Sequence, residues 1–131
     1  MAVKILLTDD EADMLELLRS RFAVNNWEVI TAQDGRECIE KIMTAAPDLV
    51  ILDIVMPKLD GYNVLNEIKN LEEENENIKQ IPIIILTAST GAQVEEFVKD
   101  ERICSCIRKP FDTEELLNMI NECLERKAVS A

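Results

Sequence analysis

The chain alternates between short runs of apolar residues and longer stretches in which apolar residues recur three and four positions apart. Short runs rich in Val, Ile and Leu are typical of strands buried on both faces, and the longer spacing is typical of amphipathic helices. Strands are predicted at residues 3–8, 27–32, 49–52, 82–87 and 103–107, and helices at residues 14–25, 34–46, 64–71, 94–98 and 112–124. Strand and helix therefore alternate along the whole chain.

Local signals at the helix ends support this pattern. Asp34 with Glu37, and Asp112 with Glu115, have the spacing of a capping acid and the residue three positions into a helix. Pro47 is expected to end the helix that precedes it, because proline lacks the backbone N–H that a helix needs.

Helical connections of this length favour parallel strands joined by right-handed crossovers. The sequence therefore predicts an α/β fold, a doubly wound three-layer sandwich whose five-stranded parallel sheet has the order 2-1-3-4-5 and carries five helices. In that order the first and third strands are neighbours at the topological switch point, where such sheets place their ligands. A length of 131 residues suits one domain with one sizeable sheet.

Polar residues that can bind ions or phosphate stand at the carboxyl ends of four predicted strands: Asp9, Asp10, Asp53, Thr87 and Lys109. Taken singly, the paired acids could cap a helix, the threonine could end a strand and the lysine could be a solvated charge. Together they predict a site, because two carboxylates about 4 Å apart repel by about 4 kcal/mol at an effective dielectric constant near 20. A hard divalent cation such as Mg²⁺ would compensate that charge.

The amino-acid composition of the chain limits the kinds of binding partner and the cellular compartment that we expect for it. A net charge of −12, from 26 acids and 14 bases, excludes direct binding to nucleic acid and docking on an anionic membrane. The N-terminal apolar run is too short for a signal peptide and no segment reaches transmembrane length, so we expect a cytoplasmic protein with reduced thiols. The four cysteines are expected to be packing residues, and a chain without histidine is not expected to bind zinc: Cys38, Cys104, Cys106 and Cys123.

The predicted site suits phosphoryl transfer onto a carboxylate. Asp53 would be the nucleophile, Mg²⁺ would offset charge on the phosphoryl oxygens, and Lys109 would hold one of those oxygens. Positioning and charge neutralisation are most of what this chemistry needs from a protein.

Four motifs in this order carry a family resemblance: Asp9-Asp10, LDIVMPKLDG at residues 52–61, Leu86-Thr87-Ala88 and Lys109-Pro110-Phe111. Over essentially the whole chain, they resemble the receiver domain of the response regulators of two-component signalling systems. The resemblance implies a flavodoxin-like fold and phosphorylation of Asp53 by a histidine kinase or a histidine phosphotransfer protein.

The resemblance also implies a role for each residue of the site. The ligands of Mg²⁺, for which Mn²⁺ would substitute, are expected to be Asp10, Asp53, the backbone carbonyl of Val55 and, through water, Asp9. Thr87 is expected to be the switch hydroxyl that moves toward the phosphoryl group, and Lys109 is expected to contact it.

On this interpretation residues 1–131 form a single receiver domain with its core at about residues 3–127. Such a domain is not an enzyme with an external substrate, since it catalyses only its own phosphorylation and dephosphorylation. It signals by changing a partner-binding face or by passing the phosphoryl group on. We expect a monomer or weak dimer with an unidentified downstream protein, either as a stand-alone receiver of the chemotaxis or phosphorelay kind or as part of a longer regulator.

Three positions depart from the family pattern. Cys106 stands where an aromatic residue usually couples to Thr87, Arg102-Ile103 replaces a pair of small residues, and the acidic residues 72–80 lengthen the third crossover. The first two departures alter the expected output surface at the fourth helix and fifth strand. They leave the phosphorylation chemistry untouched.

Other functions fit the sequence less well. A haloacid-dehalogenase-like phosphatase also uses an aspartyl phosphate, but its two acids are separated by one residue, whereas Asp9 and Asp10 are adjacent. A nucleotide- or flavin-binding domain would need a glycine-rich loop, and the glycines here are scattered at Gly35, Gly61 and Gly91. A receiver-like interaction module that works without phosphorylation is the remaining alternative.

Val55, two residues after the predicted phosphoacceptor, stands where many relatives carry a polar side chain that can hold water. We therefore expect slow self-dephosphorylation, and a shorter acyl-phosphate lifetime in Val55→Asn than in the wild type. The lifetime is measured from the decay of the phosphorylated chain after the phosphodonor is removed, with Val55→Ile as the apolar control. Equal lifetimes in wild type and Val55→Asn would contradict this role.

Overall fold

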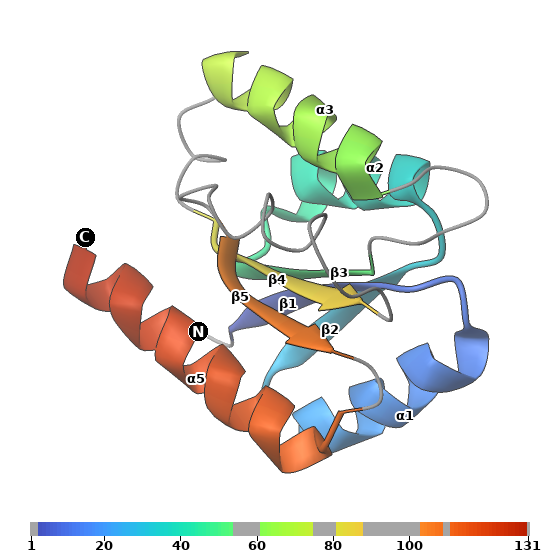
Figure 1. Cartoon of the computed structure of the whole chain (residues 1–131), viewed down its shortest axis with the longest axis vertical. Coiled ribbons are helices and arrows are strands. Elements are labelled where there is room, and N and C mark those ends of the chain that lie inside the picture. Colours follow the sequence, from blue (N-terminus) through green and yellow to red (C-terminus); the bar gives the residue numbers. More distant parts are fainter. Residues whose placement is uncertain (1–2, 54–60, 75–80, 88–102, 109–110, 131) are drawn as a thin grey trace.

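The structure is a computed structural model that describes residues 3–53, 61–74, 81–87, 103–108 and 111–130 (Figure 1). The elements follow one another as β1 Lys4–Thr8, α1 Ala12–Ala23, β2 Glu28–Ala32, α2 Gly35–Ala45, β3 Leu49–Asp53, α3 Gly61–Glu74, β4 Ile83–Thr87, β5 Ile103–Arg108 and α5 Thr113–Ser130. Each falls where the hydrophobic pattern predicts a strand or a helix. The helix predicted at residues 94–98 lies outside the described residues.

The strands form one parallel sheet of order β2-β1-β3-β4-β5. This confirms the predicted α/β sandwich and its strand order. The half-exposed pattern of β2 is explained by its place at one edge of the sheet, while β5 forms the other edge. Within the described ranges no helix is both long and apolar enough to cross a membrane.

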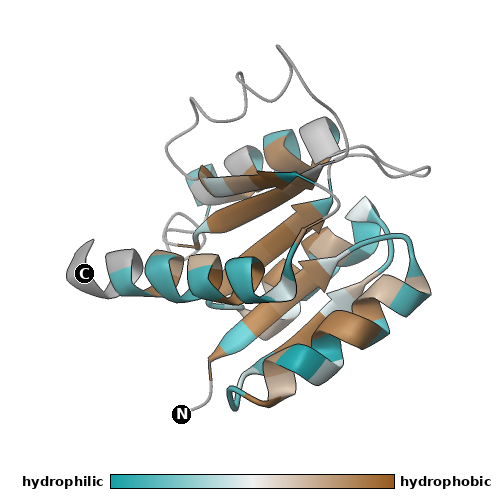
Figure 2. Ribbon diagram, turned by 60° about the horizontal axis from the view of Figure 1, so that its bottom comes forward, coloured by the Kyte–Doolittle hydropathy of each residue, from teal (hydrophilic) through white to brown (hydrophobic). Residues whose placement is uncertain are grey.

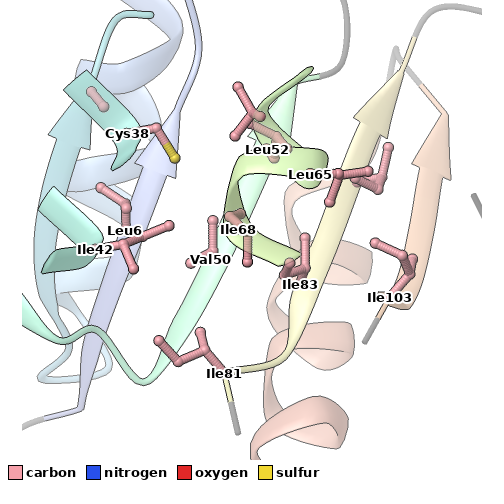
Figure 3. Close-up of a cluster of buried hydrophobic side chains, with 13 residues drawn as sticks. Leu6, Cys38, Ile42, Val50, Leu52, Leu65, Ile68, Ile81, Ile83 and Ile103 are labelled. Carbon is pink, nitrogen blue, oxygen red and sulfur yellow. The ribbon is translucent and has the colours of Figure 1, made fainter. Parts of the chain in front are cut away.

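Helices cover both faces of the sheet, α2 and α3 on one side and α1 and α5 on the other (Figure 1). Under α2 and α3, Leu6 and Val50 pack with helix residues such as Ile42 (Figure 3). Their neighbours in the strands, Leu7 and Ile51, belong to the second cluster, beneath α1 and α5. Successive residues of β1 and β3 thus serve opposite cores, which is why the inner strands are almost uniformly hydrophobic (Figure 2).

The helix ends follow from local chemistry. Asp34 accepts a hydrogen bond of 2.9 Å from the backbone N–H of Glu37, as its spacing predicts, and so begins α2. That helix ends at Ala45, and its C-cap Ala46, directly before Pro47, is a left-handed residue with φ of 47°. Asp112 begins α5 by accepting from Glu114 N at 3.0 Å.

A bulge interrupts the alternation of side chains along β5. Ile83 pairs with Ile103, but the next residue of β4 pairs with Ser105, so that Cys104 is the extra residue. Cys104 therefore packs with the cluster beneath α1 and α5, whereas Cys106 packs with the cluster beneath α2 and α3. Strict alternation would have placed both cysteines on the same side of the sheet.

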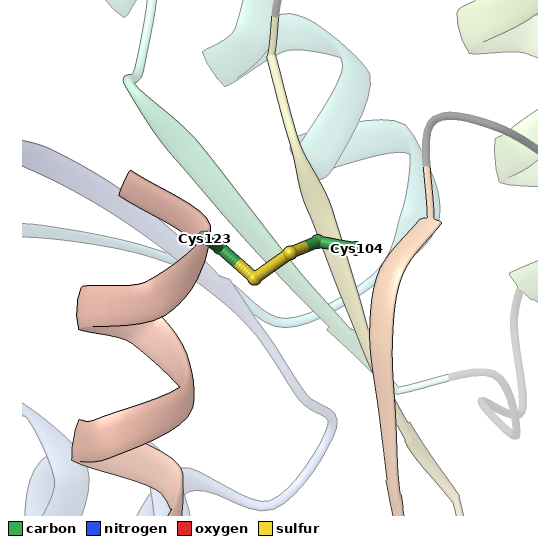
Figure 4. Close-up of a disulfide and its surroundings, with 2 residues drawn as sticks. All are labelled: Cys104 and Cys123. Carbon is green, nitrogen blue, oxygen red and sulfur yellow. A yellow bond between two sulfur atoms is a disulfide. The ribbon is translucent and has the colours of Figure 1, made fainter. Parts of the chain in front are cut away.

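Cys104, on the side of the sheet that α5 covers, forms a disulfide with Cys123 of α5, with the two Cα atoms 6.0 Å apart (Figure 4). The expectation that all four cysteines are reduced packing residues is therefore wrong for this pair. It failed because nothing in the sequence indicates that Cys104 and Cys123, 19 positions apart, meet between β5 and α5.

Cys38 and Cys106 are free thiols, as expected. Burial raises the pKa of Cys38 to about 11, which keeps this thiol protonated at neutral pH. Burial also raises the pKa of Cys106, although the positive charge of Arg108 acts in the opposite direction.

The disulfide should stabilise the fold chiefly by restricting the unfolded chain. Because it joins residues 19 positions apart, the free energy of unfolding should fall by about 3 kcal/mol when the bond is reduced. Urea unfolding of the chain with and without reductant measures this difference. The Cys123→Ala variant, which lacks the bond, should show no effect of reductant, and an equal response in both proteins would contradict the assignment.

Candidate metal centre

The register of each neighbouring pair of strands brings the carboxyl ends of β1, β3, β4 and β5 to one edge of the sheet. Thr8 at the end of β1 pairs with Leu52, so the following residues, Asp9 and Asp53, stand at the same level. Asp53 pairs with Leu86 of β4, one residue before that strand ends. The final residues of β4 and β5, Thr87 and Arg108, pair with each other in turn.

Connections leave this edge toward opposite faces of the sheet. After β1 the chain continues into α1, which packs on the same side as α5, and the helix that follows β3 is α3, on the other side (Figure 1). The ends of β1 and β3 therefore lie at the topological switch point, where sheets of this kind bind their ligands.

Three carboxylates meet at this point. One oxygen from each of Asp9, Asp10 and Asp53 lies within 4.8 Å of the others. Asp9 is fully buried, Asp53 is only 4% exposed and Asp10 is exposed. The adjacent acids of the DD motif thus occupy different environments, one inside the protein and one at its surface.

Backbone groups hold Asp9 in place. Its Oδ1 accepts a hydrogen bond of 2.9 Å from Glu11 N, and its own N–H donates to the carbonyl of Ala32 at 3.1 Å. Glu11 is the N-cap residue of α1, and its side chain makes no capping hydrogen bond. The carboxylate of Asp9 is therefore tied to the start of α1 while it lies close to the other two acids.

Repulsion decides what the cluster can bind. At 4.8 Å, a pair of unit charges repels by roughly 3.5 kcal/mol at an effective dielectric constant near 20, and less where exposed Asp10 is one of the pair. Carboxylate oxygens are the ligands that Mg²⁺ prefers, and Mg²⁺ is commonly held by one or two of them with water and phosphate. The set of donors and their spacing fit a hard divalent cation.

Beside the acids, Thr8 is fully buried at the end of β1. Its Oγ1 lies near the Cys38 thiol and lowers the pKa of that thiol. No atom in the described part of the chain is positioned to form a well-oriented hydrogen bond with this Oγ1. This polar contact between β1 and α2 was missed in the sequence, where Thr8 only marks the end of an apolar run. The contact between Thr8 and Cys38 lies on the opposite side of β1 from the cluster beneath α1 and α5.

Of the residues predicted for the site, the structure brings together Asp9, Asp10 and Asp53. It places Thr87 at the end of β4 through its backbone. Val55 and Lys109 lie outside the described residues, and Lys109 directly follows Arg108 in the chain.

Comparison with known proteins bears on this arrangement. Residues 5–121 match the family model of the response regulator receiver domain. The chain belongs to the response regulator receiver domain family. Response regulator MprA of Mycolicibacterium vanbaalenii is 35% identical over 126 residues, which cover 96% of this chain and 52% of that protein. This receiver chain thus spans about half the length of the curated relatives that it matches.

Solved structures agree with the fold of the receiver. A CheY-like receiver domain protein from Methanospirillum hungatei superimposes with a TM-score of 0.87 over the whole of both chains, at 21% identity. Response regulator TrrA from Thermotoga maritima, solved in complex with Mg²⁺ and BeF, has a TM-score of 0.76 at 30% identity and covers 92% of this chain and 98% of its own.

If the clustered acids repel, removing one charge should stabilise the metal-free receiver. We expect Asp53→Asn to raise the free energy of unfolding in EDTA by about 1–3 kcal/mol. Millimolar MgCl₂ should stabilise the wild type and not the variant, because only the wild type binds the ion well. Urea unfolding in the two buffers measures both effects.

Asp13→Asn is the matched control, since it removes an exposed charge from the first turn of α1. It should change stability by no more than about 0.5 kcal/mol and keep the response to Mg²⁺. A loss of stability for Asp53→Asn in EDTA would show that repulsion among the three acids is not significant.

Proposed function

We propose that this receiver accepts a phosphoryl group on Asp53, in a reaction that depends on Mg²⁺, from a histidine kinase or a histidine phosphotransfer protein. The observation that carries the proposal is the meeting of three carboxylates within 4.8 Å at the carboxyl edge of the sheet. A fold seldom retains such a cluster without a cation to compensate it. The complex of the Thermotoga relative with Mg²⁺ and BeF supports the same assignment.

In the proposed reaction a carboxylate oxygen of Asp53 attacks the phosphorus of a phosphohistidine. The P–N bond breaks, and the imidazole leaves with the bonding electron pair and takes up a proton. Burial of Asp53, at 4% exposure, holds the nucleophile in one place and keeps most water from the new acyl phosphate. This chain therefore contributes to the transfer in two ways: it holds the nucleophile in position, which reduces the entropic cost of the reaction, and it keeps water from the acyl phosphate.

The acids have separate tasks in this proposal. Asp10, Asp53 and the backbone carbonyl of Val55 would hold Mg²⁺ or Mn²⁺, and Asp9 would act through water. Asp9 is suited to an indirect role because Glu11 N already engages one of its oxygens. When bound, the cation would offset negative charge on the transferring group.

Thr87 and Lys109 would complete the site from the neighbouring strands. The backbone of Thr87 ends β4 beside Arg108, at the edge where Asp53 ends β3, and Lys109 is the next residue of the chain after Arg108. We assign Thr87 as the hydroxyl that responds to the phosphoryl group and Lys109 as the cation that contacts it.

We further propose that residues 1–131 contain one receiver domain, with its core at about residues 3–127, that transforms no external substrate. Its partners would be the phosphodonor protein and an unidentified downstream protein, and it would be a monomer or weak dimer. A cytoplasmic location is part of this proposal, because a histidine kinase draws on ATP. The acidic net charge of −12 supports basic protein partners and no binding to nucleic acid or membrane.

Incubation with acetyl phosphate and MgCl₂ tests the proposal without the unknown kinase. Intact mass should rise by one phosphoryl group in the wild type and in the Asp13→Ala control, and should not rise in Asp53→Ala. The signal should also disappear in EDTA, because the charge on the attacking carboxylate would no longer be compensated.

Two results would contradict the proposal. Phosphorylation that persists in Asp53→Ala would place the acceptor elsewhere. A wild type that neither gains a phosphoryl group nor responds to beryllofluoride would indicate an interaction module that works without phosphorylation.

A further inference from the structure

The disulfide lies apart from the acidic site. Cys104 is the second residue of β5, at the amino end of that strand, whereas the acids meet at the carboxyl edge of the sheet. Four residues of extended strand, about 13 Å, separate Cys104 from Arg108 at the far end of β5. The disulfide therefore shares no residue with the acidic site.

The two sulfur-bearing residues differ in access. Cys104 is half-buried on an edge strand of the sheet, while Cys123 is 1% exposed in the cluster beneath α1 and α5. A thiol that attacks this bond reaches Cys104 more easily than Cys123. Cys104 is thus the more exposed residue of the pair.

The fold does not need the bond in order to bury Cys123. The buried residues of α5 form one stripe at helical spacing, Leu116, Ile120 and Cys123, and a reduced cysteine is itself a small hydrophobic residue. Reduction would leave the first two anchors unchanged. The turns beyond Cys123, which reach Ser130, would lose their covalent tie to the sheet.

We propose that Cys104 and Cys123 form a reversible thiol–disulfide site, in which oxidation fixes the C-terminal half of α5 to β5 and reduction releases it. Its exchange partner would be a low-molecular-weight thiol such as glutathione, or a dithiol protein. In a cytoplasmic setting, which rests on the proposed function, structural disulfides are rare and most are transient or redox-sensing. The thiol chemistry itself can be tested without phosphorylation.

Reduction proceeds through Cys104 in this proposal. A thiolate attacks Cys104 Sγ, the S–S bond breaks, and Cys123 Sγ leaves as a thiolate and takes up a proton. A second thiolate attacks the small-molecule sulfur of the mixed disulfide, so that Cys104 Sγ leaves as a thiolate and takes up a proton, and a small-molecule disulfide is released. Two thiols of the reductant are thus oxidised for each protein disulfide that is reduced, and oxidation follows the reverse path.

Equilibration of the chain in buffers of varied reduced and oxidised glutathione tests reversibility. Alkylation and peptide mass mapping should find Cys104 and Cys123 blocked together at high oxidised glutathione and free together at high reduced glutathione, from either starting state. Mapping the wild type avoids dependence on a variant that folds poorly. The Cys38→Ala/Cys106→Ala chain, which retains only this pair, serves as a matched control and should titrate identically.

Single-cysteine exchange tests the direction of attack. With oxidised glutathione, Cys123→Ala should form a glutathione adduct at Cys104, and Cys104→Ala should form one at Cys123 at least about tenfold more slowly because that thiol is buried. Hydrogen exchange should then show that reduction speeds exchange in residues 121–130 of α5 and leaves residues 114–120 unchanged.

Three outcomes would overturn the proposal. A bond that never forms with excess oxidised glutathione would mean that the pair stays reduced. A bond that excess reduced glutathione leaves intact in the folded chain would mean a permanent structural disulfide. Equal adduct rates at the two positions, or unchanged exchange at the C-terminal turns of α5, would mean that neither access nor anchoring differs as the structure indicates.

Discussion

The mutual repulsion of three carboxylates at the end of the sheet is the constraint on which the rest of this structure depends. Two of the acids, Asp9 and Asp53, are buried, so water does little to screen them. The strands that carry them are correspondingly well anchored, since residues 5–7 and 49–52 are at most 1% exposed. Each such side chain contributes about 1.5–3 kcal/mol on burial, so two of them offset one repelling pair.

Burial on both faces of the sheet also fixes where the charges stand. A slip of one residue between β1 and β3 would exchange the two hydrophobic clusters and would face apolar residues with the wrong layer of helices. The register that pairs Thr8 with Leu52 is therefore set by the core, and the alignment of Asp9 with Asp53 is its consequence. Apolar packing away from the site therefore positions the carboxylates, while the repulsion between their charges opposes that arrangement.

Because the hydrophobic core sets the strand register, part of the acidic site could be predicted from the sequence. Strand order and the meeting of Asp9, Asp10 and Asp53 follow from apolar runs that end directly in acids, because parallel strands bring their carboxyl ends together. The different environments of Asp9 and Asp10 could not be read from adjacent identical letters, since backbone contacts decide them. The bulge at Cys104 was equally hidden, because inserting one residue in an edge strand leaves no periodic signal in ICSCI.

The bulge shows why an edge strand can accept an extra residue that an inner strand cannot. In β3 both neighbours demand a strict register, and an extra residue would move Asp53 away from Asp9. On β5 only β4 is affected, and pairing resumes at Ser105 so that Thr87 still meets Arg108. Cys104 and Cys106 can therefore face opposite sides of the sheet while the carboxyl edge keeps its alignment. A change in the sulfur pair can reach the acidic site only through a movement of β5 or α5, because the two sites have no residue in common.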